Sequence, residues 1–270
     1  MEDCFINEKA TQNDSVPFTI NDQLQNGVAR IEIIKEINNR DTFTGALMKL
    51  VNEEKTYYFL VTCAHCISKK EIEEKKQISI YYGKKGKEKY IPLNLNEEER
   101  FIKCYEEVFG LDITVIQLFN NDIKGIIDDK NFFIPDYIYK NGYNNYNNQT
   151  IYIAGYPWND KEKDLKEGTI SRGKTLMLEE KDVFRHDCNT DKGSSGSPVI
   201  WKNKIIGIHK SGSLGNYNKG TFIGPIIDDL LHLLENEDKM KLFKKNENEL
   251  NIINWQFESK KILYYITNSR

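Results

Sequence analysis

Short runs of apolar, β-branched and aromatic residues recur along most of the sequence, and polar turn residues separate them. The longest runs, 57–64 and 113–119, have the length of a β-strand and are far too short to span a membrane. A different pattern begins at Pro225, which suits the first position of a helix, and continues to residue 235. The sequence therefore predicts an all-β fold, either a barrel or a sandwich, followed by a helix. The expected strands lie at 28–37, 43–50, 56–63, 77–82, 88–93, 111–119, 150–156, 168–178, 182–188, 199–201, 204–209 and 219–224.

Length and charge limit the classes of function. The 270 residues suit one large or two small domains. The net charge is −3, so nothing points to nucleic acid or to an anionic membrane surface as a partner.

The first residues lack the basic and apolar regions of a secretory signal, and we expect 1–26 to be a loose tail or a pro-segment. The charged runs 68–76 and 94–100 are expected to be solvated surface, and 135–149, rich in Asn and Tyr, to link two halves.

Five cysteines, at positions 4, 63, 66, 104 and 188, are spaced too irregularly for a disulfide scaffold. Free thiols in a reducing compartment are the simplest account, and with no visible signal peptide they favour a cytoplasmic location. Cys63 and Cys66 flank His65 like half of a metal site, but a structural zinc would need a second close pair, and the sequence has no other C-x-x-C. We therefore expect no metal and no cofactor.

The sequence KGSSGSP at 192–198 comes directly before an expected strand. Glycines allow backbone angles that are closed to other residues. The backbone N–H groups of Gly193 and Ser195 can then point at one spot and hold a negatively charged oxygen. Clusters of Ser and Gly are commonly plain turns, and a serine hydroxyl becomes a nucleophile only with a base and a group that orients the base. The rest of the chain must therefore supply a histidine and a buried acid.

His65 and Asp112 meet this requirement. His65 follows the expected strand 56–63, and Asp112 opens the apolar run 111–119, where a carboxylate needs hydrogen-bond partners. Because each candidate lies beside a strand, each can be held on a rigid scaffold. We predict that Ser195 is the nucleophile and that His65 takes its proton and passes it to the leaving amine. Asp112 would hold the other ring nitrogen of His65 and stabilise the imidazolium.

These three segments resemble the motifs of trypsin-like serine proteases. TCAHC at 62–66 is similar to T-A-A-H-C, LDITVIQL at 111–118 to D-I-A-L-L, and GSSGSP at 193–198 to G-D-S-G-G-P. The resemblance covers about residues 28–238 and keeps the order of the family. It implies a double six-stranded β-barrel, with the active site in the cleft between the barrels. The implied peptidase domain is 27–238, with barrel one at about 27–134, barrel two at about 150–224, a helix within 225–238, and an extension of unassigned role at 239–270.

Within this family the resemblance is strongest to the glutamyl endopeptidases. They share G-x-S-G-S-P-V, found here at 193–199, and a following strand that ends in Gly-Ile-His, here 207–209. The resemblance implies that His209 and Thr190 bind the glutamate side chain of the substrate, and Lys192 at the pocket mouth can add a cationic donor. The plainer alternatives are that His209 is a core residue of its strand and Thr190 a loop residue.

Roles are also expected for four further residues, Ser211, Gly212, His186 and His232. Ser211 and Gly212 are expected to pair with the substrate backbone as an edge strand. His186, near the loop that leads to Ser195, and His232, in the terminal helix, are expected to have core or surface roles.

The sequence thus predicts a serine endopeptidase that acts on proteins or peptides through an acyl-enzyme, with a preference for Glu or Asp before the scissile bond. Two departures from the family are visible. Ser194 replaces the acid that trypsin uses in zymogen activation, and the strand 43–50 has no cysteine to pair with Cys66. Two alternatives stay open. A catalytically silent binding module would be expected to have a broken triad, and an HtrA-like quality-control protease would need a peptide-binding domain larger than 239–270.

Overall fold

A computed structural model describes residues 23–235, apart from short gaps at 25, 37–38, 53–54, 84–87, 107–109, 125–126, 160–163, 166–167, 181 and 213–216. Most of the expected tail 1–26 and the whole extension 239–270 therefore lie outside the described residues. The chain divides into two compact units, Met1–Pro225 and Ile226–Arg270, and the first contains every strand found among the described residues. None of the helices in the described part of the chain is long and apolar enough to cross a lipid bilayer.

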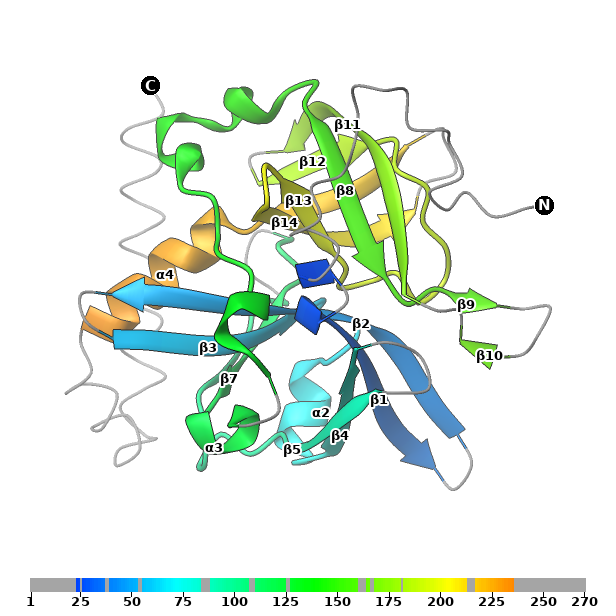
Figure 1. Cartoon of the computed structure of the whole chain (residues 1–270), viewed down its shortest axis with the longest axis vertical. Coiled ribbons are helices and arrows are strands. Elements are labelled where there is room, and N and C mark those ends of the chain that lie inside the picture. Colours follow the sequence, from blue (N-terminus) through cyan, green and yellow to red (C-terminus); the bar gives the residue numbers. More distant parts are fainter. Residues whose placement is uncertain are drawn as a thin grey trace. The chain divides into compact units, whose positions relative to one another are not determined.

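The first half of unit one forms a seven-stranded antiparallel sheet with the order β5-β4-β1-β2-β3-β7-β6 (Figure 1). Apolar residues alternate along these strands, as in Ile78, Ile80 and Tyr82 of β4, and this spacing places them on one buried face. They belong to a core cluster that also takes Ile31, Leu47 and Leu60 from neighbouring strands. The strands are β1 (Val28–Glu36), β2 (Asn39–Asn52), β3 (Lys55–Thr62), β4 (Gln77–Tyr82), β5 (Lys89–Asn94), β6 (Ile102–Cys104) and β7 (Thr114–Leu118).

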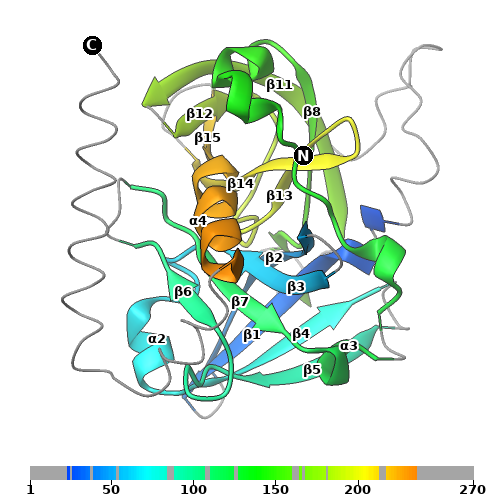
Figure 2. The ribbon, with the colours of Figure 1, turned by 90° about the vertical axis from the view of Figure 1, so that its left-hand side faces the viewer.

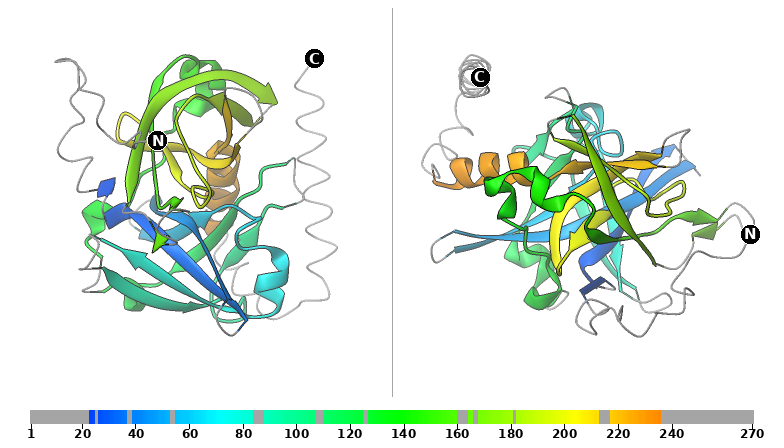
Figure 3. Two further views of the ribbon diagram at one scale, coloured as in Figure 1. Left: turned by 90° about the vertical axis from the view of Figure 1, so that its right-hand side faces the viewer. Right: turned by 90° about the horizontal axis from the view of Figure 1, so that it is seen from above.

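The second half of unit one forms a closed six-stranded barrel with the order β11-β12-β15-β14-β13-β8. Figure 2 shows this barrel next to the first sheet, and the long strand β11 curves over the barrel in Figure 3. Val199, Phe184 and Phe222 belong to its core. The strands are β8 (Thr150–Gly155), β11 (Thr169–Glu180), β12 (Val183–His186), β13 (Pro198–Trp201), β14 (Lys204–Gly212) and β15 (Asn218–Phe222), and the short pair β9 (Trp158–Asn159) and β10 (Asp164–Leu165) forms a separate hairpin.

The segment 135–149 runs between the sheet and the barrel and packs on the barrel. It contains two 3₁₀ turns, η2 (Ile138–Asn141) and η3 (Tyr143–Tyr146). Tyr143 stacks on Phe222 of the barrel with ring centroids 4.2 Å apart, and the buried Tyr146 donates its hydroxyl proton to Asp136 at 2.8 Å. The aromatic residues of the segment 135–149 therefore contribute to the core of the barrel.

The all-β fold is confirmed, with differences in detail. The first sheet has seven strands, and its end strands β5 and β6 are not hydrogen-bonded to each other in the described part of the chain. The strand β6 was not expected, because its three residues are too few to show a period. The charged run 68–76, expected as solvated surface, contains the short helix α2 (Lys69–Glu73), which Ser68 and Glu71 cap. Short turns α3 (Asn120–Ile123) and η1 (Asp129–Asn131) follow β7.

The helix expected at 225–235 is present as α4 (Gly224–Glu235). Its apolar residues, among them Ile226, Leu230 and Leu234, recur at helical spacing and form one side of the helix. His232 is exposed on it, which agrees with the surface role expected for this residue.

Candidate active site

His65 and Asp112 lie together at the ends of two paired strands of the first sheet. Strand β3 runs directly into the turn that carries His65. Two hydrogen bonds close this turn, because the carbonyl of Cys63 accepts from Cys66 N at 3.1 Å and from Ile67 N at 3.2 Å. Thr114 on β7 fastens the same turn by donating from Oγ1 to the carbonyl of Ile67 at 2.7 Å. The turn is therefore anchored to the strand that follows Asp112.

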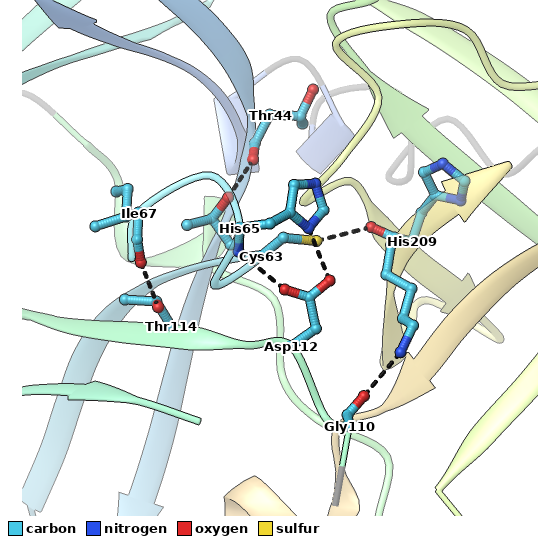
Figure 4. Close-up of polar contacts among 10 residues, drawn as sticks. Thr44, Cys63, His65, Ile67, Gly110, Asp112, Thr114 and His209 are labelled. Carbon is cyan, nitrogen blue, oxygen red and sulfur yellow. Dashed lines mark hydrogen bonds and ion pairs between the residues drawn. The ribbon is translucent and has the colours of Figure 1, made fainter. Parts of the chain in front are cut away.

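Two hydrogen bonds hold the carboxylate of Asp112 against His65 (Figure 4). Oδ1 accepts from the backbone N–H of His65 at 2.9 Å, and Oδ2 lies 2.7 Å from Nδ1 of the ring. Asp112 has a left-handed φ of 53°, which Asp and Asn tolerate better than most residues. The acid expected at the start of the apolar run thus has hydrogen-bond partners, as burial of a carboxylate requires.

This contact gives the ring nitrogens of His65 different roles. The hydrogen bond to Asp112 is the largest cause that raises the pKa of His65 well above its ordinary value, and the neighbouring Cys66 adds to the rise. With the Nδ1 proton directed at the carboxylate, Nε2 of the neutral ring is left as a proton acceptor. A histidine held in this way can take a proton from a hydroxyl and be stabilised when it becomes cationic.

The segment 191–197 forms a tight turn with glycines at two left-handed positions. Gly193 has φ 90° and Gly196 has φ 89°. Ser194 N donates to the carbonyl of Asp191 and Ser197 N to the carbonyl of Ser194, each at 3.0 Å. A Cβ at position 196 would lie 1.9 Å from the carbonyl oxygen of Thr44, so only glycine fits there.

Thr44 on β2 joins this turn to the rest of the site. Its N–H donates to the carbonyl of Ser195 at 3.0 Å, and its Oγ1 donates to the carbonyl of Gly193 at 2.9 Å. The same Oγ1 accepts from Tyr156 N at 2.9 Å, and the carbonyl of Thr44 accepts from Thr62 Oγ1 at 2.7 Å. Sequence reasoning missed Thr44, because one threonine in an apolar strand is a weak signal.

The carbonyl of His209 on β14 brings the two halves of the site together. It accepts from Gly196 N at 3.0 Å and from the thiol of Cys63 at 3.1 Å. The turn before His65 and the turn that carries Ser195 therefore meet at one oxygen atom. Among the described residues, no group accepts a hydrogen bond from the backbone N–H of Gly193 or of Ser195. Ser195 itself is half-buried.

The imidazole of His209 is buried in the second barrel beside His186 of β12. His186 Nε2 lies 3.2 Å from His209 Nδ1, and the two residues are 0% and 3% exposed. Burial lowers the pKa of His186 to about 4 and that of His209 to about 3, so both rings are neutral at pH 7. His186 therefore lies in the core, one of the two roles expected for it, and the contact with His209 was not expected.

The other expected pocket residues lie in two groups. Thr190 is half-buried in the loop before the turn and Lys192 is exposed within the turn, and neither side chain hydrogen-bonds to His209 in the part of the chain described. Ser211 and Gly212 pair with β15 through Lys219 and Asn218, and β13 pairs only with earlier residues of β14.

A comparison with protein-family models matches residues 44–208 to the trypsin-like peptidase domain. The match covers more than half of the sequence and includes all three segments that carry His65, Asp112 and Ser195. The chain belongs to the trypsin-like peptidase family.

Curated relatives of this trypsin-like peptidase include a glutamyl endopeptidase of Staphylococcus aureus strain MRSA252, which is 32% identical over 108 residues. That match covers 40% of this chain and 26% of the relative, so the chain spans about a quarter of the relative's length.

Solved structures agree on the fold. The catalytically active tobacco etch virus protease complexed with product superposes with a TM-score of 0.52 at 14% identity, covering 83% of this chain and 82% of that chain. A serine endoprotease from Yersinia pestis gives 0.52 at 12% identity, covering 83% and 69%.

Proposed function

We propose that this trypsin-like peptidase is a serine endopeptidase in which Ser195, His65 and Asp112 form the catalytic triad. The observation that carries the proposal is the Asp112 carboxylate, which receives both the backbone N–H and the ring Nδ1 of His65. A histidine that a carboxylate holds in this way can act as the base that takes the proton of a nearby serine hydroxyl. The turn that carries Ser195 is tied to the turn before His65 through the carbonyl of His209.

The proposed reaction follows from these groups. Ser195 Oγ attacks the peptide carbonyl while Nε2 of His65 takes the hydroxyl proton, and Asp112 stabilises the resulting imidazolium. The N–H groups of Gly193 and Ser195, which have no other partner among the described residues, would donate to the oxygen that becomes negative. The C–N bond then breaks as His65 gives its proton to the amine. Water, deprotonated by the same ring, hydrolyses the acyl ester and frees Ser195.

The proposed specificity is for Glu or Asp before the scissile bond. It rests on the glutamyl endopeptidase relative and on His209, which lies on the strand next to the Ser195 turn. Because His209 is neutral, it would offer a substrate carboxylate one N–H donor, and the carboxylate would raise its pKa. Thr190 and Lys192 are the proposed further donors. Residues 210–212, beyond the pairing with β13, are the proposed edge for the substrate backbone.

The test is digestion of a mixed peptide library by the full chain, by Ser195→Ala and by His209→Ala. We expect the wild type to cut after Glu or Asp and Ser195→Ala to lose about 10⁶-fold in kcat, as loss of a triad nucleophile does. His209→Ala should lose cleavage after acidic residues more than it loses cleavage after neutral ones.

Two results would count against parts of this proposal. Cleavage by the wild type after other residues would keep the serine endopeptidase and remove the acidic preference. Equal activity of the wild type and Ser195→Ala would remove Ser195 as the nucleophile.

A further inference from the structure

The proposed reaction gives no use to the thiol of Cys63. It is fully buried and lies beside the His65–Asp112 pair (Figure 4). The Sγ of Cys63, a ring nitrogen of His65 and a carboxylate oxygen of Asp112 all lie within 4.8 Å of one another. A thiol, an imidazole and a carboxylate are the three side chains that bind Zn²⁺ most often.

The three ligand atoms lie near the spacing that a metal requires, since none of their separations exceeds 4.8 Å. Ligand atoms around tetrahedral zinc lie roughly 3.5 Å apart, since each is about 2.0–2.3 Å from the metal. Nδ1 of His65 and Oδ2 of Asp112 are 2.7 Å apart, so they would separate by less than about 1 Å. The proton now shared between them would leave as the metal enters.

Solvent reaches this cluster from the side of His65 and Asp112. The side chain of His65 is 47% exposed and that of Asp112 is 22% exposed, whereas Cys63 is 0% exposed. A metal ion would therefore arrive at the imidazole and carboxylate and reach the thiolate from there. Cys66 is half-buried beside them and interacts with both Cys63 and His65.

We propose that Cys63, His65 and Asp112 form an inhibitory Zn²⁺ site, with the fourth position open to water. The proposal adds a form of regulation to the serine endopeptidase proposed above and rests on it for the inhibitory effect. The binding itself depends only on the three side chains.

Inhibition follows from the chemistry of imidazole. A neutral ring that binds zinc through Nδ1 carries its proton on Nε2, so Nε2 has no lone pair to accept the serine proton. A ring that binds through Nε2 has its catalytic nitrogen occupied by the metal. In either case His65 cannot act as the base until the metal leaves.

The experiment is a titration of the chelator-treated full chain with ZnCl₂ and, separately, with CoCl₂. Zinc should inhibit peptide cleavage at one ion per chain, and a chelator should restore the activity. Cobalt should give the near-ultraviolet charge-transfer band of a thiolate–cobalt bond. Ser195→Ala should show the same band, because it leaves all three ligands in place.

The deciding variant is Cys63→Ser. A serine hydroxyl can still donate to the carbonyl of His209 but is a poor zinc ligand. This variant should lose the cobalt band, and the zinc concentration for half-inhibition should rise at least about tenfold. Cys104→Ser, a thiol outside the cluster, is the matched control and should behave as the wild type does. If Cys63→Ser does not fold, Asp112→Asn removes another ligand and should weaken cobalt binding to a similar degree.

Two outcomes would overturn the site. One is the absence of a thiolate band in the wild type, and another is zinc inhibition that is unchanged in Cys63→Ser. If the chain cleaves no peptide, the proposed function fails, but the cobalt titration still decides whether the metal site exists.

Discussion

Asp112 acts on His65 through both carboxylate oxygens, so the two contributions can be separated by substitution. Asp112→Asn keeps a residue that tolerates the φ of 53° and can still accept from the backbone N–H of His65. It replaces the carboxylate whose hydrogen bond is the largest cause of the raised pKa of His65. Since only the neutral ring is a base, activity rises as the pH passes upward through this pKa.

We expect Asp112→Asn to lower kcat by about 10⁴-fold and to move the rise in activity to lower pH. The measurement is the dependence of kcat/KM on pH for the wild type and the variant. A fall in kcat with an unchanged midpoint would mean that Asp112 does not set the pKa of His65.

At the scale of elements, strand β2 positions the turn that carries Ser195 through Thr44. Thr44→Val has almost the same shape but lacks the hydroxyl that donates to the carbonyl of Gly193 and accepts from Tyr156 N. It leaves the buried N–H of Tyr156 unsatisfied, at about 1–3 kcal/mol, and takes away one partner of the half-buried Gly193 carbonyl. We expect a lower free energy of unfolding and, because the proposed oxyanion donors are less well held, a kcat at least about tenfold lower.

Denaturant unfolding and steady-state kinetics check this, with Thr42→Val as the matched control. Thr42 lies two residues away on the same strand and is only half-buried. If both variants lose the same stability and the same kcat, Thr44 has no special part in holding the turn.

The strands and the three motif segments could be predicted from the sequence because their signals are local. Alternating apolar residues gave the strand of Ile78 and Ile80, and the residues around Ser195 gave a glycine turn. The role of Thr44 could not be predicted, since its partner Gly193 is 149 residues away and only the closed fold brings them together. The contact between His186 and His209 could not be predicted for the same reason. Their strands, β12 and β14, come near each other because each pairs with β15.

At the scale of the whole molecule, this buried histidine pair ties stability to pH. The pKa of His186 is lowered to about 4 and that of His209 to about 3 from the ordinary 6.5. As the pH falls below 6.5, the unfolded chain binds protons that the folded chain does not bind, so stability that is present near pH 7 is lost toward pH 4. Each histidine should cost about 2 kcal/mol between pH 7 and pH 5.

His186→Gln removes one titrating group and keeps a side chain that can donate to Nδ1 of His209. We expect its free energy of unfolding to fall less steeply between pH 7 and pH 5 than that of the wild type, by about 2 kcal/mol. His232→Gln, which changes an exposed histidine, should keep the wild-type slope. Denaturant unfolding at several pH values measures all three proteins. Equal slopes for the wild type and His186→Gln would mean that the buried pair does not resist protonation, because the barrel either lets it accept a proton or opens locally around it.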